Sequence, residues 1–136
     1  MKLLLFQAKK FYWASFSKTL AEVPEQEEVA ETVEETLVVF LHAEAEDQAN
    51  PKLETKVVKN IKWLANKRNF KNIVLHSFTH LSGSTATPEF AQGLLNRLEE
   101  RLTQTGYRVW QTPFGYFCEW DLSVYGDSLA KVFKEL

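Results

Sequence analysis

The amino-acid sequence predicts an α/β domain in the layered α+β arrangement, with one sheet covered by amphipathic helices. Two observations carry this prediction. Short runs of strand-forming residues alternate with longer segments whose apolar residues recur at helical spacing. Each predicted helix is apolar along one stripe only, as expected for a helix that packs on a sheet by one face. The expected order of elements is ββαβαβ(β)α.

The first two predicted strands each contain a short apolar run. Residues 3–6 (Leu-Leu-Leu-Phe) form the first, continued by the basic and aromatic residues 9–13, and residues 37–42 (Leu-Val-Val-Phe-Leu-His) form the second. The second is apolar at nearly every position, which is typical of a strand buried on both faces. Residues 21–35 lie between them and hold seven glutamates but no lysine or arginine, which predicts a solvated loop or short helix.

The first helix is predicted to begin at Asn50 and Pro51, an N-cap followed by proline at the first helical position, and to end near Arg68. Its apolar stripe consists of Leu53, Val57, Ile61, Leu64 and Ala65. Four lysines fall within about a third of the circumference on the opposite side: Lys52, Lys56, Lys59 and Lys62.

The second half of the chain repeats the alternation. A strand over residues 73–78 precedes a helix capped by Thr87 and Pro88 and closed by Gly106. Further strands are predicted over residues 107–110 and 116–124. A C-terminal helix is expected after Asp127, and its inward-facing residues are Leu129, Val132, Phe133 and Leu136.

Composition sets limits on the kind of protein. At 136 residues, with a 45% hydrophobic fraction and a net charge of −2, the chain is predicted to form one domain over residues 1–136. A single cysteine, Cys118, rules out an internal disulfide and fits a reducing cytoplasm. The apolar run 3–6 is too short for a signal peptide, and no segment approaches the roughly 18 apolar residues of a membrane helix. We therefore expect a cytoplasmic protein with no membrane partner.

Two segments about thirty residues apart are the candidate site: residues 78–82 (Phe-Thr-His-Leu-Ser) and 113–117 (Pro-Phe-Gly-Tyr-Phe). Each lies where a predicted strand meets a loop, which is where ligands bind in α/β sheets. His80, Thr79, Ser82 and Cys118 are expected to converge there. The aromatic residues around Cys118 are expected either to wall a small pocket or to belong to the core.

Each candidate has a functional and a purely structural interpretation. His80 is either a proton-transfer group or a strand-end histidine bonded to the backbone, and His42 and His76 are expected to be core residues. Cys118 is either a nucleophile paired with a histidine or, the favoured interpretation, a small buried hydrophobe. The lysine face is either a phosphate-binding track or simply solvated.

No cofactor or metal is expected from the motifs. Residues 82–87 are small and polar and lead into a helix N-terminus, so they are either an anion-binding loop or a plain connection. They lack the spacing of a phosphate-binding P-loop, and the three histidines lack metal-binding spacing.

Residues 78–82, the run Leu94-Leu95-Asn96-Arg97 and residues 112–116 (Thr-Pro-Phe-Gly-Tyr) together resemble one family. They are similar to the N-terminal editing domain of archaeal threonyl-tRNA synthetases, a relative of D-aminoacyl-tRNA deacylases. The resemblance spans nearly the whole chain and is strongest over residues 72–116. It implies a D-aminoacyl-tRNA deacylase-like fold and removal of serine wrongly attached to threonine tRNA, a second sieve that the synthetic site cannot supply.

The resemblance also implies a site between the strands that binds the terminal 3′ adenosine and the amino acid, where water attacks the ester. In this sequence His80 matches the family histidine and Thr79 the small pocket residue. Cys118 stands where the family has a lysine, Lys131 where it has a glutamate, and Gln7-Ala8-Lys9 where it has His-Ser-Asp. The implied catalytic set is His80, Cys118 and Lys131. The implied substrate-binding set is Thr79, Ser82, Pro113, Phe114, Gly115, Tyr116 and Phe117. The candidate tRNA contacts are Lys9, Lys10, Lys52, Lys56 and Lys59.

Three functions are therefore open. The leading hypothesis is an aminoacyl-tRNA deacylase acting in trans, since the chain ends at Leu136 just after the domain, either free-standing or excised. The second is a non-catalytic relative that binds an aminoacyl-adenosine or the tRNA end. The third is a Cys118-dependent hydrolase unrelated to tRNA. The resemblance also suggests a homodimer and association with a threonyl-tRNA synthetase.

Overall fold

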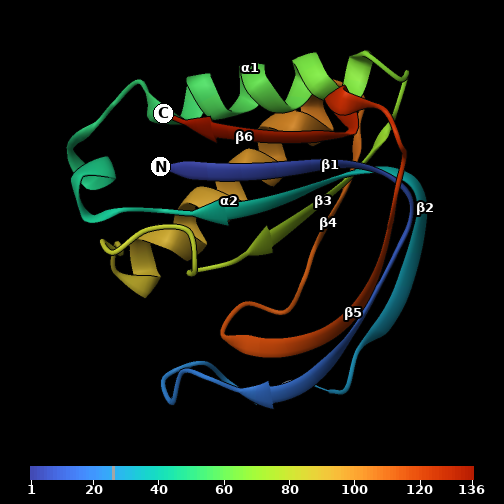
Figure 1. Cartoon of the computed structure of the whole chain (residues 1–136). Coiled ribbons are helices and arrows are strands. Elements are labelled where there is room, and N and C mark those ends of the chain that lie inside the picture. The colour runs from blue at the N-terminus through green and yellow to red at the C-terminus, as the bar shows by residue number, and fades with distance from the viewer. Residues whose placement is uncertain (26) are drawn as a thin grey trace.

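The computed structural model describes residues 1–25 and 27–136, and in this part of the chain six strands form one curled mixed sheet with two helices on one side (Figure 1). The strands are β1 (Lys2–Lys18), β2 (Ala30–His42), β3 (Asn72–Ser77), β4 (Arg108–Gln111), β5 (Tyr116–Val124) and β6 (Lys131–Glu135). The helices are α1 (Leu53–Asn66) and α2 (Pro88–Gln104), with short 3-10 turns at Ala45–Ala49 and Ser128–Ala130. The predicted layered arrangement of one sheet covered by helices is confirmed.

The sheet has the order β4-β3-β2-β1-β5, with β6 beside β1. Strands β2, β3 and β4 run parallel, whereas β1 is antiparallel to β2, β5 and β6. The first five residues of β1 pair with β6, and the part from Ala8 to Lys18 pairs with β5. The sheet bends between these two parts, so that β5 and the far half of β1 curl over the face opposite the helices (Figure 1).

The bend coincides with two irregularities in the strands. The pairing of β1 with β5 shifts register between Ala8 and Lys10. On β2, Glu35 has a positive φ of 48°, and its carboxylate accepts a hydrogen bond from the Tyr125 hydroxyl at 2.7 Å. Left-handed backbone is unfavourable for a residue with a Cβ, so this contact helps to hold the bend.

Each face of the sheet has its own core. Leu3, Leu5, Leu37 and Val39 point toward α1 and α2, whereas Phe11, Trp13 and Phe40 fill the concave side. Residues 37–41 are all buried. The prediction that this run of β2 is covered on both faces is confirmed.

The strands are longer than predicted at two places. β1 continues to Lys18, and β2 begins at Ala30 inside the glutamate-rich segment predicted as loop or helix. Glu31 and Glu34 are exposed while Val33 is buried. The acidic side chains therefore face solvent from a strand whose backbone is paired with β1. Gln26, also in this segment, lies outside the described residues.

The two predicted helix starts have different outcomes. Thr87 caps α2 as predicted: its hydroxyl accepts a hydrogen bond from the Phe90 N–H, and Pro88 follows. The predicted start of α1 at Asn50 is wrong, because Asn50 closes the preceding 3-10 turn through an N–H bond to the Asp47 carbonyl. The α1 helix begins three residues later.

The predicted C-terminal helix is wrong. After the turn at Ser128–Ala130 the chain forms β6, antiparallel to the start of β1. Val132 packs against the helix-side core, while Phe133 is half exposed and pairs with Leu4. The four apolar positions have helical spacing (i, i+3, i+4, i+7), but pairing with the edge of β1 overrides this local pattern and places Val132 and Phe133 on opposite faces of a strand. No helix in the described residues is long and apolar enough to cross a membrane.

Candidate functional site

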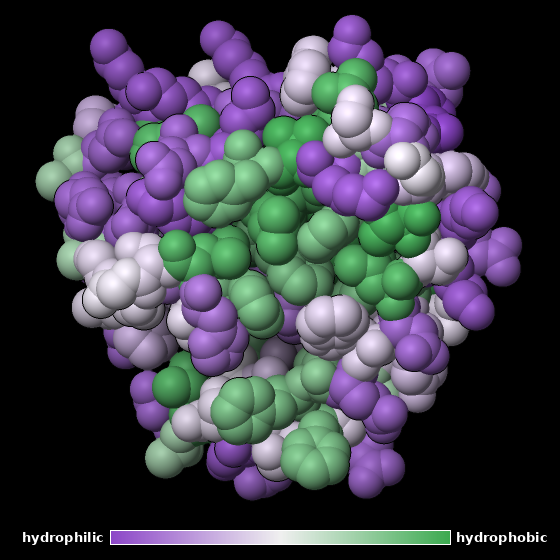
Figure 2. All heavy atoms as spheres, viewed as in Figure 1, coloured by the Kyte–Doolittle hydropathy of each residue, from purple (hydrophilic) through white to green (hydrophobic). Residues whose placement is uncertain are grey.

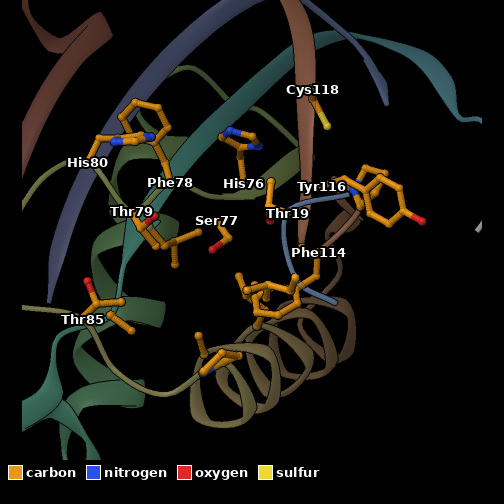
Figure 3. A pocket seen from close by; sticks show the side chains of 18 of the residues that line it. Thr19, His76, Ser77, Phe78, Thr79, His80, Thr85, Phe114, Tyr116 and Cys118 are labelled. Atoms are coloured by element: carbon orange, nitrogen blue, oxygen red, sulfur yellow. The ribbon is translucent and has the colours of Figure 1, made fainter. Parts of the chain in front are cut away.

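A cavity of about 440 Å³ opens at the carboxyl end of the parallel strands β2 and β3, beside the N-terminus of α2 (Figure 3). This volume suits a small-molecule site. Apolar side chains gather around a hollow on this face of the molecule (Figure 2). The apolar part of the lining includes Leu41, Ala43, Ala86, Ala91, Leu94 and Leu95.

One wall is the loop of residues 78–87, which is bonded along its length to residues 41–48. His42 makes two of these bonds, since its Nδ1 accepts from the Leu81 N–H at 3.0 Å and its Nε2 lies 3.1 Å from the Thr85 hydroxyl. Because Nδ1 accepts, Nε2 carries the proton and donates to Thr85. His42 is fully buried, as predicted, and it also fixes the shape of this wall.

The opposite wall is the turn of residues 113–117 that leads into β5. Gly115 has a φ of 77°, a conformation that glycine adopts without strain. Its carbonyl accepts a hydrogen bond from the Thr19 N–H at 2.7 Å. The turn is thereby tied to the end of β1.

Most of the residues predicted for the site line this cavity. The lining includes Thr79, His80, Cys118 and all five residues of the 113–117 turn. Thr79 and His80 are exposed at the rim, where the His80 ring lies edge-on to Phe78 at 5.0 Å. The two segments selected from the sequence do come together.

Ser82 and Lys131 lie elsewhere. The Ser82 hydroxyl donates to the Glu44 carboxylate at 2.6 Å, which anchors the loop behind the cavity. Lys131 begins β6 and donates its ammonium to the Tyr125 carbonyl at 3.0 Å. Neither side chain lines the cavity, so we leave both out of the set that we propose to touch substrate.

Cys118 lies in surroundings that disfavour a thiolate. Its side chain is half-buried, and burial raises the pKa of its thiol above the ordinary value. In the described part of the chain, no basic group lies within hydrogen-bond distance of its sulfur. An uncharged thiol is a weak nucleophile, which speaks against a cysteine-dependent mechanism.

His76 lines this cavity but was not predicted as a site residue. It was expected to be core, and it is buried, yet its ring also lines the cavity (Figure 3). Its Nδ1 lies 2.8 Å from the hydroxyl of Thr112, which is also buried. Only the alternation of side chains along β3 and the parallel pairing of β3 with β4 could have indicated this contact from the sequence.

The ionisation of His76 predicts a pH dependence of stability. Burial lowers its pKa from 6.5 to about 4, so below pH 6.5 the unfolded chain binds a proton that the folded chain does not. Stability should therefore fall as the pH drops from 6.5 toward 4, by about 2–3 kcal/mol from this group. Urea unfolding at several pH values should show this slope in the wild type but not in His76→Phe. Equal slopes in the two proteins would contradict the assignment.

The lysines predicted to contact tRNA lie away from the cavity lining. Lys52, Lys56 and Lys59 are exposed on the outer face of α1, whereas Lys9 lies 5.5 Å from the centre of the Tyr125 ring. Lys10 is also exposed. Among the described residues, no three His, Cys, Asp or Glu side chains are grouped so as to hold a metal ion.

The fold and the cavity define a class: a mixed α/β domain with a cavity at the carboxyl end of its parallel strands. A solved structure of the c-Myc DNA Unwinding Element Binding Protein has a TM-score of 0.70 to this chain at 16% identity, covering 100% of this chain and 99% of that one. That likeness shows the fold alone. The family described as the archaea-specific editing domain of threonyl-tRNA synthetase matches residues 1–136.

Curated relatives agree with the family match. The threonine–tRNA ligases of Methanosphaera stadtmanae and Staphylothermus marinus are each 34% identical to this chain, over 138 and 140 residues, and that of Thermococcus onnurineus is 32% identical over 139. All three alignments cover 100% of the chain but 22% of the relative. The chain belongs to the archaea-specific editing domain family of threonyl-tRNA synthetase.

Proposed function

We propose that this domain proofreads by hydrolysing the ester of a mischarged aminoacyl-tRNA, with serine on threonine tRNA as the substrate that the resemblance implies. One observation carries the proposal. The two segments that match the family motifs form opposite walls of one cavity, in a chain that belongs to an editing-domain family. We propose that the cavity holds the 3′ adenosine with its amino acid.

The lining suits ester hydrolysis by a positioned water. An ester is activated enough that orientation and polarisation of its carbonyl supply much of the rate. Hydroxyl and imidazole groups from Thr79 and His80 lie at the rim, and Phe114 and Tyr116 offer flat surfaces to the nucleoside. In this proposal Cys118 contacts substrate as a small uncharged wall residue.

We propose that the exposed lysines of α1, with Lys9 and Lys10, contact tRNA phosphates beyond the cavity. The chain as a whole carries a net charge of −2, whereas these lysines make the surface around them locally positive, as phosphate binding requires. We further propose that the domain works in the cytoplasm, in trans, on tRNA charged by a threonyl-tRNA synthetase. The homodimer suggested by the resemblance stays a prediction that sedimentation can test.

The test is a panel of purified substrates: Ser-tRNA, Thr-tRNA and a D-aminoacyl-tRNA. Selective release of serine is expected, with release slowed in His80→Ala and largely retained in Cys118→Ala. Saturable binding without turnover would instead support the non-catalytic relative, an alternative favoured by the uncharged Cys118. Release lost in Cys118→Ala but kept in His80→Ala would overturn the proposal.

A further inference from the structure

His76 lies in the cavity in a fixed orientation. Its ring packs 4.8 Å from that of Phe40 and 6.0 Å from that of Phe78, and the residue is 6% exposed. In the view of Figure 3 the imidazole lies between the side chains of Phe78 and Cys118. These contacts restrict the orientation of the ring beside the cavity.

The contact with Thr112 sets which ring nitrogen carries the proton. In the described part of the chain, the Thr112 hydroxyl has no hydrogen-bond partner except His76 Nδ1. A buried hydroxyl that cannot donate leaves its hydrogen unpaired, which costs more than an unused lone pair. Thr112 therefore donates to Nδ1, and the proton of the neutral ring is on Nε2.

Nε2 has no protein partner among the described residues. The buried side-chain atoms there that lack a partner and are closed off from solvent are Trp13 Nε1 and Asn72 Oδ1. His76 Nε2 is not one of them, so this atom is accessible, and the residue to which it belongs lines the cavity. An accessible donor without a protein partner, on a largely buried ring that lines a cavity, points to an acceptor that the bound ligand supplies.

We propose that His76 is a catalytic residue whose Nε2–H donates a hydrogen bond to the carbonyl oxygen of the aminoacyl ester. This inference rests on the proposed function. The resemblance places a lysine of the family at Cys118, whose thiol is uncharged here. The neutral imidazole supplies a donor in the same cavity, and its low pKa keeps it neutral at physiological pH.

The step balances without any other reactant. Water adds to the ester carbonyl carbon, and the carbonyl electron pair moves onto the oxygen that Nε2–H holds. The intermediate then collapses, the bond from this carbon to the ribose oxygen breaks, and the ribose oxygen takes the proton released by water. The products are the free amino acid and the tRNA 3′ end. His76 keeps its proton throughout.

The kinetic test uses three substitutions and a control. His76→Phe should lower kcat by about 10²–10³-fold with little change in KM, as for the loss of one oxyanion donor. His76→Gln should recover part of the loss because its amide can donate. Thr112→Val should lower kcat by a smaller factor, because the ring loses the hydrogen bond that favours the tautomer with its proton on Nε2. Thr103→Val, an exposed position on α2, should match the wild type. A folded His76→Phe with wild-type kcat would overturn this role alone.

A second measurement does not depend on activity. Two-bond ¹H–¹⁵N correlation spectra of the histidine rings should show the proton of His76 on Nε2. Its signal should move when seryl-3′-amino-adenosine, an amide analogue that resists hydrolysis, binds. A proton on Nδ1, or no shift at saturation, would overturn the inference. A wild type that releases no amino acid from any aminoacyl-tRNA would overturn the proposed function and the catalytic step together.

Discussion

Replacing Glu44 with glutamine should lower the free energy of unfolding by about 3 kcal/mol. Glu44 is 5% exposed, and its carboxylate bonds the Met1 ammonium at 2.5 Å, the Lys2 ammonium at 3.1 Å and the Ser82 hydroxyl at 2.6 Å. Removing one partner of a buried ion pair leaves a buried charge undercompensated, at a cost of about 3–5 kcal/mol. The lower end applies because Asp47 still bonds the Met1 ammonium.

The ionisation of Glu44 also predicts that the free energy of unfolding decreases at acid pH. Its bond to the Met1 ammonium, followed by that to Ser82, lowers the pKa of Glu44 from 4.5 to about 2. The stabilisation is therefore complete above pH 4.5 and is lost as the pH falls through 2. Urea unfolding of Glu44→Gln should show a shallower slope in this window. Glu46→Gln, at an exposed neighbouring position, should behave like the wild type within about 0.5 kcal/mol. A change under 1 kcal/mol in Glu44→Gln would contradict the account.

Replacing Gly115 with alanine should have an effect of similar size, about 3 kcal/mol, and should also distort the cavity. A side chain at φ 77° costs about 1–2 kcal/mol. The added Cβ would lie 2.6 Å from Cγ2 of Val23, which is buried, and such overpacking costs a further 1–3 kcal/mol. Thermal unfolding and amino-acid release should both decline.

Two matched variants separate the causes. Adding Val23→Ala to Gly115→Ala should recover the part due to the clash but not the backbone strain. Gly83→Ala places its Cβ in open space and should be nearly neutral. If Gly115→Ala unfolds at the wild-type temperature, the turn does not need glycine and this explanation of the 113–117 wall is wrong.

Local patterns predicted the parts of the fold that local chemistry decides. The Thr87 cap with Pro88 fixed the start of α2, and the all-apolar run 37–41 identified a strand covered on both faces. The C-terminal segment could not be predicted in this way, because its apolar residues have helical spacing although the segment forms a strand. The open edge of β1, a partner more than a hundred residues away, selects the strand.

The candidate site shows the same division. Strand-to-loop transitions and family motifs correctly predicted that His80, Cys118 and the 113–117 turn lie close together, and all of them line one cavity. They did not identify His76, which has the sequence pattern of any core histidine. Its contact with Thr112, the residue that directly follows the neighbouring strand β4, results from sheet pairing and not from spacing along the chain.

The most direct test of the editing site is the rate at which serine is released from Ser-tRNA by the wild type and by Ala91→Phe. Ala91 lies on the first turns of α2 and lines the cavity, so a phenyl ring there fills the volume proposed for substrate. We expect the wild type to release serine. A folded Ala91→Phe should release it at least about tenfold more slowly, which corresponds to an increase of about 1.4 kcal/mol in the activation free energy. Equal release by the two folded proteins, or none by the wild type, would contradict the assignment of this cavity as an editing site.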